Sequence, residues 1–340
     1  MSRRESLAVL LVTATAAVGT AFAEHPPLAP LPPLPPGPIV VLADGGILAA
    51  RLESIDGEGV TVRSPVLGKV TLPRSAVRGC HASTAIGPIA SQTLDGRAGE
   101  RAVVRLANGD RVGAAVVSIE AGDLRLDTAL PGAREVRIPM PLVRSIDFPA
   151  VTPAYAPVRR LVALVDGSRF TAELVPSAAD VADIVAVVHD GGRGRLLAGL
   201  DPVGAREESG DETTWPLVRG GTLTGDWPTA RGTTAFTGLG IHAPDRIRYR
   251  LEKPATRLTA RVAIDDSAGQ GGGVTVGVVA TDAAGRSREV HASPILRGGD
   301  PLHAIDVGLD GATEIELIVD PADVGSVLDR TIWLDPRVEW

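Results

Sequence analysis

The chain has 340 residues, of which 44% are hydrophobic and 22% charged, a composition suited to a folded protein of two or three domains. Its formal net charge is −7, and no basic stripe interrupts this acidic balance. Nucleic acid is therefore excluded as an expected partner, because phosphate neutralisation supplies most of that affinity. Aromatic residues make up only 3% of the chain, so few side chains can stack on a ligand.

The first 23 residues have the pattern of a signal peptide. Arg3 and Arg4 form a basic start, residues 7–18 are apolar, and the "AFA" of residues 21–23 offers small residues at a cleavage site. We therefore expect the mature protein to be secreted or to lie in the periplasm or cell envelope. An uncleaved membrane anchor is the alternative. No later apolar run is long enough to cross a bilayer, so we expect no stable membrane span after cleavage.

A proline-rich segment follows at residues 24–38. It holds eight prolines in "EHPPLAPLPPLPPGP", and this density favours polyproline II over helix or sheet. The segment is predicted to be a semi-rigid spacer ahead of the first folded unit. A ligand for a proline-binding partner is the alternative.

Two β repeats are predicted next, at residues 39–100 and 101–150. The stretch "LADGGILAARLESIDGEGVTV" from Leu42 matches "LANGDRVGAAVVSIEAGDLRL" from Leu106. Further on, "LPRSAVRG" from Leu72 matches "IPMPLVRS" from Ile138. The Asp-Gly and Asn-Gly pairs are strong hairpin signals, because both central residues of a type I′ turn need positive φ. We expect small, strongly bent antiparallel sheets or SH3-like barrels.

A third copy, degenerate, is predicted at residues 151–205, beginning with "LVDGSRFTAEL" from Leu164. The stretch "SAADVADIVAVV" is the best candidate helix, although its run Ile184–Val188 suits a buried strand equally well. Residues 206–232 are polar, contain Trp215 and are predicted to be a junction.

Cys80 is the only cysteine. It has no internal disulfide partner, so the folded units must rely on their cores for stability. We expect a structural thiol; a reactive thiol or an intermolecular bridge is the alternative.

The last segment, residues 233–340, consists of alternating strand patterns and turns. Apolar residues at every second position predict strands with one buried face: 258–264, 274–280 and 315–319. Asp310-Gly311 predicts a turn between strands. About a hundred such residues suit a β-sandwich. The expected fold class is therefore all-β, with N-terminal small SH3-like or barrel-type β repeats followed by a C-terminal jelly-roll β-sandwich.

Four pieces of this segment resemble the NPCBM family of carbohydrate-binding-type modules, and they occur in the family's order. The pieces are "GLGIHAPDRIRYRL", "ARVAIDDSAGQGGGVTVGVVATDAAG", "ASPILRGGDPLHAIDVGLDGATEIELIVD" and "LDRTIWLDPRVEW". The resemblance covers about a third of the chain. It implies a galactose-binding-like β-sandwich. The upstream repeats resemble those of secreted envelope proteins of planctomycete-type bacteria.

The sequence departs from the family pattern in several places, among them the closing motif and the middle strand "VTVGVVAT", which has no Phe or Tyr. In the closing motif, the family usually has an acidic residue immediately before the tryptophan, whereas this chain has Ile332, and it retains Asp329 and Trp333. Sugars are usually bound by an aromatic platform and a few polar groups. The candidate carbohydrate-binding residues are therefore Trp333, Asp329, Asp265, Asp266 and His242. From its apolar neighbours, Trp333 is also a candidate core residue.

Several of these side chains have a structural alternative. Asp265 and Asp266 open the turn "SAGQGGG", where two carboxylates are a candidate structural Ca²⁺ site, although an Asp-capped turn fits the pattern better. Asp320, Asp323 and Asp329 raise the same question. His242, His291 and His303 lack the spacing of a zinc site, and we expect a structural role for His242.

No catalytic motif is present: the chain has no GxSxG elbow, no P-loop and no dinucleotide fingerprint. The sequence therefore predicts no enzyme activity and no cofactor beyond the candidate Ca²⁺. It predicts an exported protein whose C-terminal module binds glycan or polysaccharide at the cell envelope or outside. The alternative is a structural envelope or matrix protein whose repeats and sandwich contact envelope proteins, with sugar binding lost. A hydrolase accessory chain is a third hypothesis.

Overall fold

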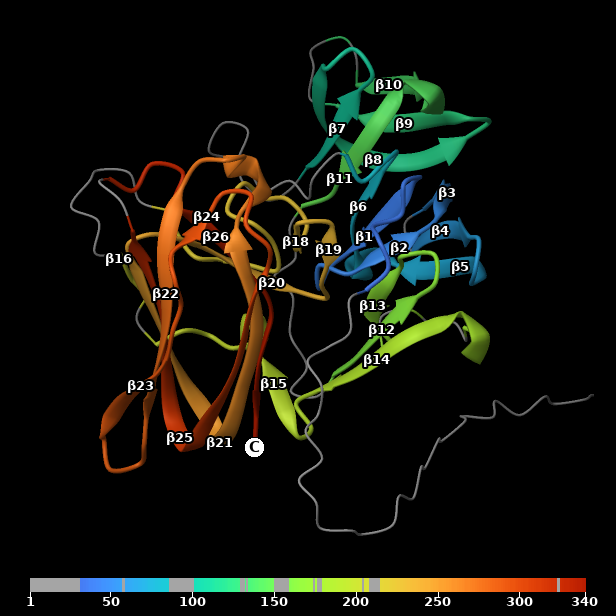
Figure 1. Ribbon diagram of the computed structural model, residues 1–340. Helices are drawn as coiled ribbons and strands as arrows, with labels where there is room; N and C mark the ends of the chain where they lie inside the picture. The colour runs from blue at the N-terminus through green and yellow to red at the C-terminus, as the bar shows by residue number, and fades with distance from the viewer. Residues whose placement is uncertain are drawn as a thin grey trace, which may run out of the picture.

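The protein is described by a computed structural model, and its described residues form strands and short 3-10 helices without an α-helix. These residues are 31–56, 59–85, 101–128, 132, 134–149, 159–173, 175, 179–203, 205–207, 215–322 and 325–340. The all-β fold class is confirmed. The predicted signal peptide, residues 1–23, lies outside the described residues. Figure 1 shows the repeat region in blue and green beside the C-terminal sandwich in orange and red.

The first repeat is a bent antiparallel unit. Its elements are β1 (Ile39–Leu42), β2 (Ile47–Ala49), β3 (Arg51–Ile55), β4 (Gly59–Ser64), β5 (Gly68–Pro73), η1 (Arg74–Ala76) and β6 (Val77–His81). β1 pairs with both β2 and β6, and β3, β4 and β5 form a meander beside them. Alternate side chains of β4 and β5 are buried, as expected for strands with one face against a core.

The second repeat follows a similar order. Its elements are β7 (Ala102–Leu106), β8 (Arg111–Glu120), β9 (Asp123–Asp127), β10 (Glu135–Pro139), η2 (Met140–Leu142) and β11 (Val143–Asp147). The single long strand β8 stands in place of β2 and β3. The third segment is shorter: β12 (Arg159–Leu164), β13 (Arg169–Thr171), η3 (Val181–Asp183) and β14 (Ile184–Asp190). The described part of the candidate helix, residues 179–188, therefore contains a 3-10 turn followed by a strand, because β-branched residues fill β14.

The three segments begin with the same turn. The backbone N–H groups of Gly45, Gly109 and Gly167 each donate to a leucine carbonyl three residues earlier, at 3.0 Å in all three. The φ angles of these glycines are 87°, 92° and 84°, a region that suits glycine. Asp-Gly and Asn-Gly therefore form hairpin turns at the predicted positions. SH3-like closure of each copy stays a prediction.

Most repeat strands join into one sheet, while β3, β4 and β5 form a separate one. In the described part of the chain the order of the larger sheet is β10-β9-β8-β7-β11-β6-β1-β2-β13-β12-β14. β6 pairs with β11, which joins the first and second segments, and β2 pairs with β13, which joins the first and third. A shared apolar core contains Cys80, which is buried. Burial raises the pKa of this thiol to about 12, which keeps it protonated and favours the structural role expected for it.

The sandwich is built on two long strands, β21 (Asp245–Ile264) and β25 (His303–Pro321). The first half of β21 pairs with the second half of β25, and the remaining halves pair with each other after register shifts. Both strands therefore contribute to both layers. The other strands are β15 (Gly194–Leu196), β16 (Ala205–Glu207), β17 (Val218–Arg219), β20 (Gly238–His242), β22 (Gly273–Thr281), β23 (Ser287–Ala292), β24 (Leu296–Arg297) and β26 (Arg330–Glu339).

The predicted turn at Asp310-Gly311 is wrong as a chain reversal. Both residues have positive φ, 49° and 80°, but β25 continues through them as one strand. They lie where the facing β21 shifts register between Arg250 and Arg257. The two strands bend together at this point, which carries them from one layer of the sandwich to the other. The predicted inward positions of β25, residues 315, 317 and 319, are confirmed as fully buried.

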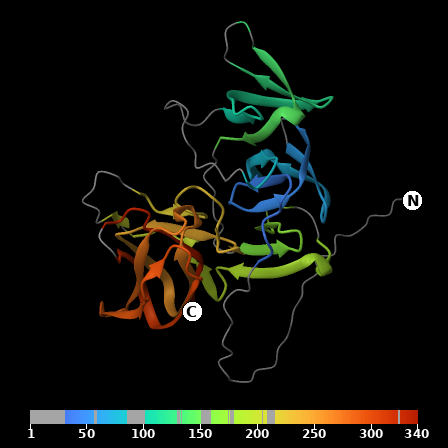
Figure 2. The same cartoon turned by 45° about the horizontal axis from the view of Figure 1, so that its top comes forward.

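Loops between the two regions fasten the sandwich to the repeats (Figure 2). Trp227, on the loop between β17 and the small hairpin of β18 (Thr229–Ala230) and β19 (Thr233–Thr234), packs against Ile39, Val41 and Ile47 of the first repeat. Its Nε1–H donates to the Thr84 carbonyl at 3.0 Å. Leu34, from the end of the predicted spacer, packs on the same cluster. This large buried ring therefore ties the two regions together.

Candidate functional site

One end of the sandwich gathers most of the residues predicted from the sequence. At this end β26 begins at Arg330, which pairs with His242 at the end of β20. On the other side of β26, the backbone N–H of Asp265 donates to the Arg330 carbonyl at 2.8 Å. Asp329 immediately precedes the strand. The structure therefore brings His242, Asp265 and Asp329 around the start of one strand.

Gly238 and Gly240 give β20 its close path into this end. A Cβ at Gly240 would lie 2.6 Å from the Leu223 backbone N, and one at Gly238 would lie 2.6 Å from Ile332 Cδ1. Neither residue has positive φ. The absence of a side chain at both positions permits this close approach, which fixes where β20 presents His242.

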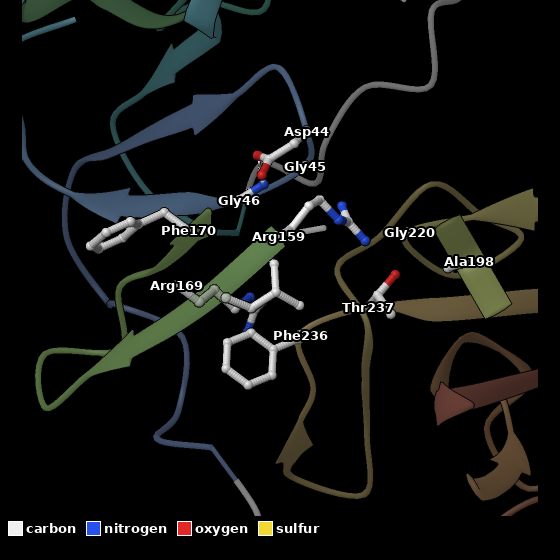
Figure 3. A pocket seen from close by; sticks show the side chains of 11 residues that line it. Asp44, Gly45, Gly46, Arg159, Arg169, Phe170, Ala198, Gly220, Phe236 and Thr237 are labelled. Carbon is white, nitrogen blue, oxygen red and sulfur yellow. Dashed lines mark hydrogen bonds between the residues drawn. The ribbon is translucent and has the colours of Figure 1, made fainter. Parts of the chain in front are cut away.

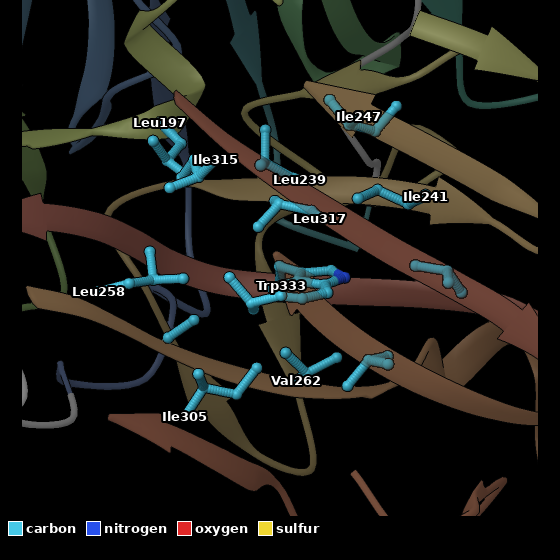
Figure 4. Close-up of a cluster of buried hydrophobic side chains, with 14 of the residues drawn as sticks. Leu197, Leu239, Ile241, Ile247, Leu258, Val262, Ile305, Ile315, Leu317 and Trp333 are labelled. Carbon is cyan, nitrogen blue, oxygen red and sulfur yellow. The ribbon is translucent and has the colours of Figure 1, made fainter. Parts of the chain in front are cut away.

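Trp333 lies one step further inside, in the centre of the sandwich core (Figure 4). Its side chain is 0% exposed and packs among aliphatic residues such as Leu239 and Val262. A ring without exposed surface has no face to offer a sugar. The structure therefore places Trp333 at the core position that its apolar neighbours had indicated, and its contribution is packing.

The acidic side chains at this end are engaged by the backbone. Asp265 Oδ1 accepts the Ser267 N–H at 2.8 Å, and Asp329 Oδ1 accepts the Gly273 N–H at 2.8 Å. Asp266 forms an ion pair with Arg231 at 3.1 Å. Within the described ranges, no three His, Cys, Asp or Glu side chains are grouped for a metal ion. These contacts favour the capped turn over the Ca²⁺ hypothesis. Asp323 lies outside the described residues.

The aromatic feature of this end is a stacked pair that sequence reasoning missed. The Trp215 and His242 rings are nearly parallel, at 5°, with centroids 5.4 Å apart. Both side chains are half-buried, so part of the pair faces solvent. His242 Nδ1 lies 2.7 Å from the Ala243 carbonyl, which can only accept, so Nδ1 carries the hydrogen. This contact fixes the orientation of the histidine ring and therefore of the pair.

A small cavity of about 30 Å³ lies elsewhere, between the repeats and the sandwich (Figure 3). Arg169 lines it and is buried. Burial lowers the pKa of Arg169 to about 10, although the negative charge of Asp335 acts in the opposite direction. Burial raises the pKa of Asp335 to about 6, while the Thr237 N–H and Arg261 act against that shift. The cavity has room for a water rather than for a sugar ring, so it belongs to the contact between the two regions.

The structure also brings together two histidines that the sequence left apart. The Nε2 atoms of His291 on β23 and His303 on β25 lie 3.0 Å apart. Burial and the neighbouring His303 lower the pKa of His291, which favours the neutral form of His291. Two ring nitrogens without a third ligand among the described residues do not make a metal centre.

The C-terminal region matches a known family of domains. Residues 202–339 match the model of the NPCBM/NEW2 domain. This match confirms the resemblance found in the sequence, and it begins ahead of the segment that carried that resemblance. The resemblance of the upstream repeats to envelope proteins stays a prediction, as do the predicted domain boundaries.

One curated protein shares sequence with part of this chain. A protein of Renibacterium salmoninarum named "Putative endo-alpha-N-acetylgalactosaminidase" is 33% identical over 97 residues, which make up 28% of this chain and 6% of that protein. The chain thus spans only a small part of that relative's length.

Solved structures of carbohydrate-binding modules are also similar. A CBM51 module of Clostridium perfringens GH95, in complex with methyl-galactose, is 17% identical with a TM-score of 0.36, covering 43% of this chain and 99% of the module. Tandem CBM51 modules of a family 98 glycoside hydrolase from Streptococcus pneumoniae are 13% identical with a TM-score of 0.36, covering 88% of this chain and 87% of theirs. Among the described residues, no helix has the length and apolar character to cross a membrane.

Proposed function

We propose that this chain is an exported, non-catalytic protein that binds glycan or polysaccharide through the end of its C-terminal sandwich. The observation that carries the proposal is the match of residues 202–339 to the NPCBM/NEW2 domain, together with a half-buried aromatic pair at one end of that domain. The repeats then act as a scaffold that holds the module. The signal peptide predicted at residues 1–23 supports export to the envelope or beyond.

The Trp215–His242 pair supplies what the buried Trp333 cannot. The C–H face of a pyranose packs on an aromatic ring, while nearby polar groups bind its hydroxyls. Arg330 is paired directly with His242 across the sheet, so their side chains leave the same face. A guanidinium beside an aromatic pair offers several donors to sugar hydroxyls. We therefore assign Trp215, His242 and Arg330 to the proposed binding surface.

A glycan array with the full chain tests this proposal, followed by calorimetry with the best ligand. Trp215→Ala and His242→Ala should each weaken binding at least tenfold, because each removes half of the stacked pair. Trp340→Ala is the matched control, since this half-buried tryptophan bonds the Gly192 carbonyl beside β15. Binding that survives both substitutions would overturn the assigned surface. Release of sugar from a polysaccharide by the purified chain would overturn the non-catalytic assignment.

A structural envelope protein remains the second candidate, and one observation favours it. Trp333, Asp265 and Asp329, which the sequence offered as binding residues, are 0%, 2% and 3% exposed. Burial of these side chains is what we expect of a surface that has lost its sugar contacts. Absence of binding to every glycan tested, combined with capture of envelope proteins, would favour this function over the first.

A further inference from the structure

Each of the three repeat segments ends with a 3-10 turn and a strand held in the same way. The backbone N–H that follows the first strand donates to the last residue of the 3-10 turn: Ala43 to Ala76, Ala107 to Leu142, and Val165 to Asp183, at 3.0, 2.8 and 2.9 Å. In each segment, the pairing between the first strand and the last strand also shifts register at the end of the first strand. β6, β11 and β14 therefore occupy equivalent positions.

Two of these equivalent strands pair with each other. Cys80 of β6 lies opposite Ile146 of β11, and each is the fourth residue after the anchoring carbonyl. The flanking hydrogen bonds are symmetric: Ala82 N–H donates to the Arg144 carbonyl, and Phe148 N–H donates to the Arg78 carbonyl, both at 2.8 Å. The first and second repeats thus meet in an antiparallel pair with local two-fold symmetry.

The third equivalent strand, β14, has no such partner among the described strands. It ends the sheet and pairs only with β12. Ala172 N–H donates to the Arg160 carbonyl, so the peptide groups of Arg160 face β13. Alternation along β12 and β14 then directs the peptide groups of Val185, Val187 and His189 outward.

The side chains of this edge are apolar. Val185 and Val187 are 46% and 47% exposed, and no lysine, glutamate or proline interrupts "IVAVV". The opposite edge of the same sheet, β10, has Glu135 and Arg137 and ends at Pro139. Charges and proline protect an edge from pairing with another chain, whereas an exposed apolar edge invites it. The two ends of the sheet therefore differ in a way that favours pairing at β14.

We propose that β14 pairs antiparallel with β14 of a second copy of this chain, about a two-fold axis at Val187. Val187 is the fourth residue after the anchoring Asp183 carbonyl, so it corresponds to Cys80 and Ile146 at the centre of the β6–β11 pair. In this register Val187 faces Val187 of the second copy, and Val185 faces its His189. No like charges meet, and the exposed valines of both chains cover one another.

The dimer joins the repeat sheets of two copies into one continuous sheet. Each copy would also carry its own sandwich, and two linked modules bind a repeating glycan more tightly than one. This consequence rests on the proposed function, whereas the strand pairing does not. Loss of glycan binding would therefore leave the dimer proposal standing.

Light scattering after size exclusion, over a series of concentrations, tests the dimer with the full chain. We expect the wild type to approach twice its chain mass and Val187→Lys to remain a monomer, because two lysines would meet on the axis. Val327→Lys is the matched control, since this valine is 83% exposed on the sandwich; it should remain a dimer. A wild type that stays monomeric throughout, or a Val187→Lys protein that remains a dimer, overturns the proposal.

Cysteine cross-linking tests the register independently. Directly opposed residues of a hydrogen-bonded antiparallel pair have Cα atoms about 5.5 Å apart, within disulfide range. Val187→Cys should therefore form a covalent dimer on mild oxidation. Val185→Cys should not, because its two copies would lie about 13 Å apart along the strands. The wild type, with Cys80 buried, provides the background. A dimer that links through neither position, or through Val185→Cys alone, overturns the pairing at Val187.

Discussion

The sandwich and the repeat region are both built from antiparallel strands, but their sheets end differently. In the sandwich, β21 and β25 run through both layers, so the sheet folds over its own core. In the repeat region, three similar segments lie side by side in an open sheet. The two edge strands of this sheet are β10 and β14. The difference teaches that long bent strands close a module, whereas short repeated ones leave edges that must be protected or paired.

The comparison extends to the tryptophans. Trp333 fills the closed core of the sandwich, Trp227 fills the contact between the two regions, and Trp215 lies half-exposed at the sandwich end. The first two are expected to hold structure, while the third is expected to bind. Three measurements can break or sharpen the comparison between the two regions.

The largest expected effect comes from Trp333→Ala. Removal of a fully buried ring from the core should lower the free energy of unfolding by about 4–5 kcal/mol, since the lost packing adds to the cavity left behind. Denaturant unfolding, followed by a spectroscopic signal from the sandwich, measures this loss of stability. Trp215→Ala is the comparison, and it should change stability much less. Equal losses in the two variants would contradict the division between core and surface tryptophans.

Trp227→Ala should have the next largest effect, about 3 kcal/mol, and it should act on the contact between the regions. The ring is 4% exposed and packs on the first repeat. We expect calorimetry to resolve separate unfolding transitions for the repeats and the sandwich. Trp227→Phe keeps most of the apolar contact but loses the bond to Thr84, so it should show an intermediate result. A single unchanged transition in Trp227→Ala would show that other contacts hold the regions together.

The smallest expected effect is a pH dependence that belongs to the sandwich alone. The pKa of His291 is lowered by burial and by His303, while Glu289 acts in the opposite direction. Below about pH 6.5 the unfolded chain takes up a proton that folded His291 resists, so this group's contribution to stability falls as the pH drops. Between pH 7 and pH 5, the melting temperature of the wild type should therefore fall relative to that of His291→Gln, which lacks this group. An identical slope in the variant would assign the effect to other groups.

The strands and their buried faces could be predicted from the sequence because the signal is local. Alternation along residues 258–264 and 315–319 follows from the period of two in a strand, whatever the partner is. The Asp-Gly and Asn-Gly turns were equally local, since they depend on the φ angles of single residues. Asp310-Gly311 shows the limit of this logic: the same dipeptide bends a strand instead of reversing it, because the facing β21 bends with it.

The proposed binding surface and the β14 sheet edge depended on contacts between residues far apart in the chain. Trp215 belonged to a polar junction in the sequence, and only the folding of that junction onto β20 stacks its ring on His242. Trp333 retained the family motif yet lies in the core. The run Ile184–Val188 suited a buried strand, but the tertiary structure places it at an edge with two valines exposed. Sequence alone thus determined which residues form strands, since backbone period is local; tertiary structure decided which strands meet and which side chains face solvent, since pairing joins residues far apart in the chain.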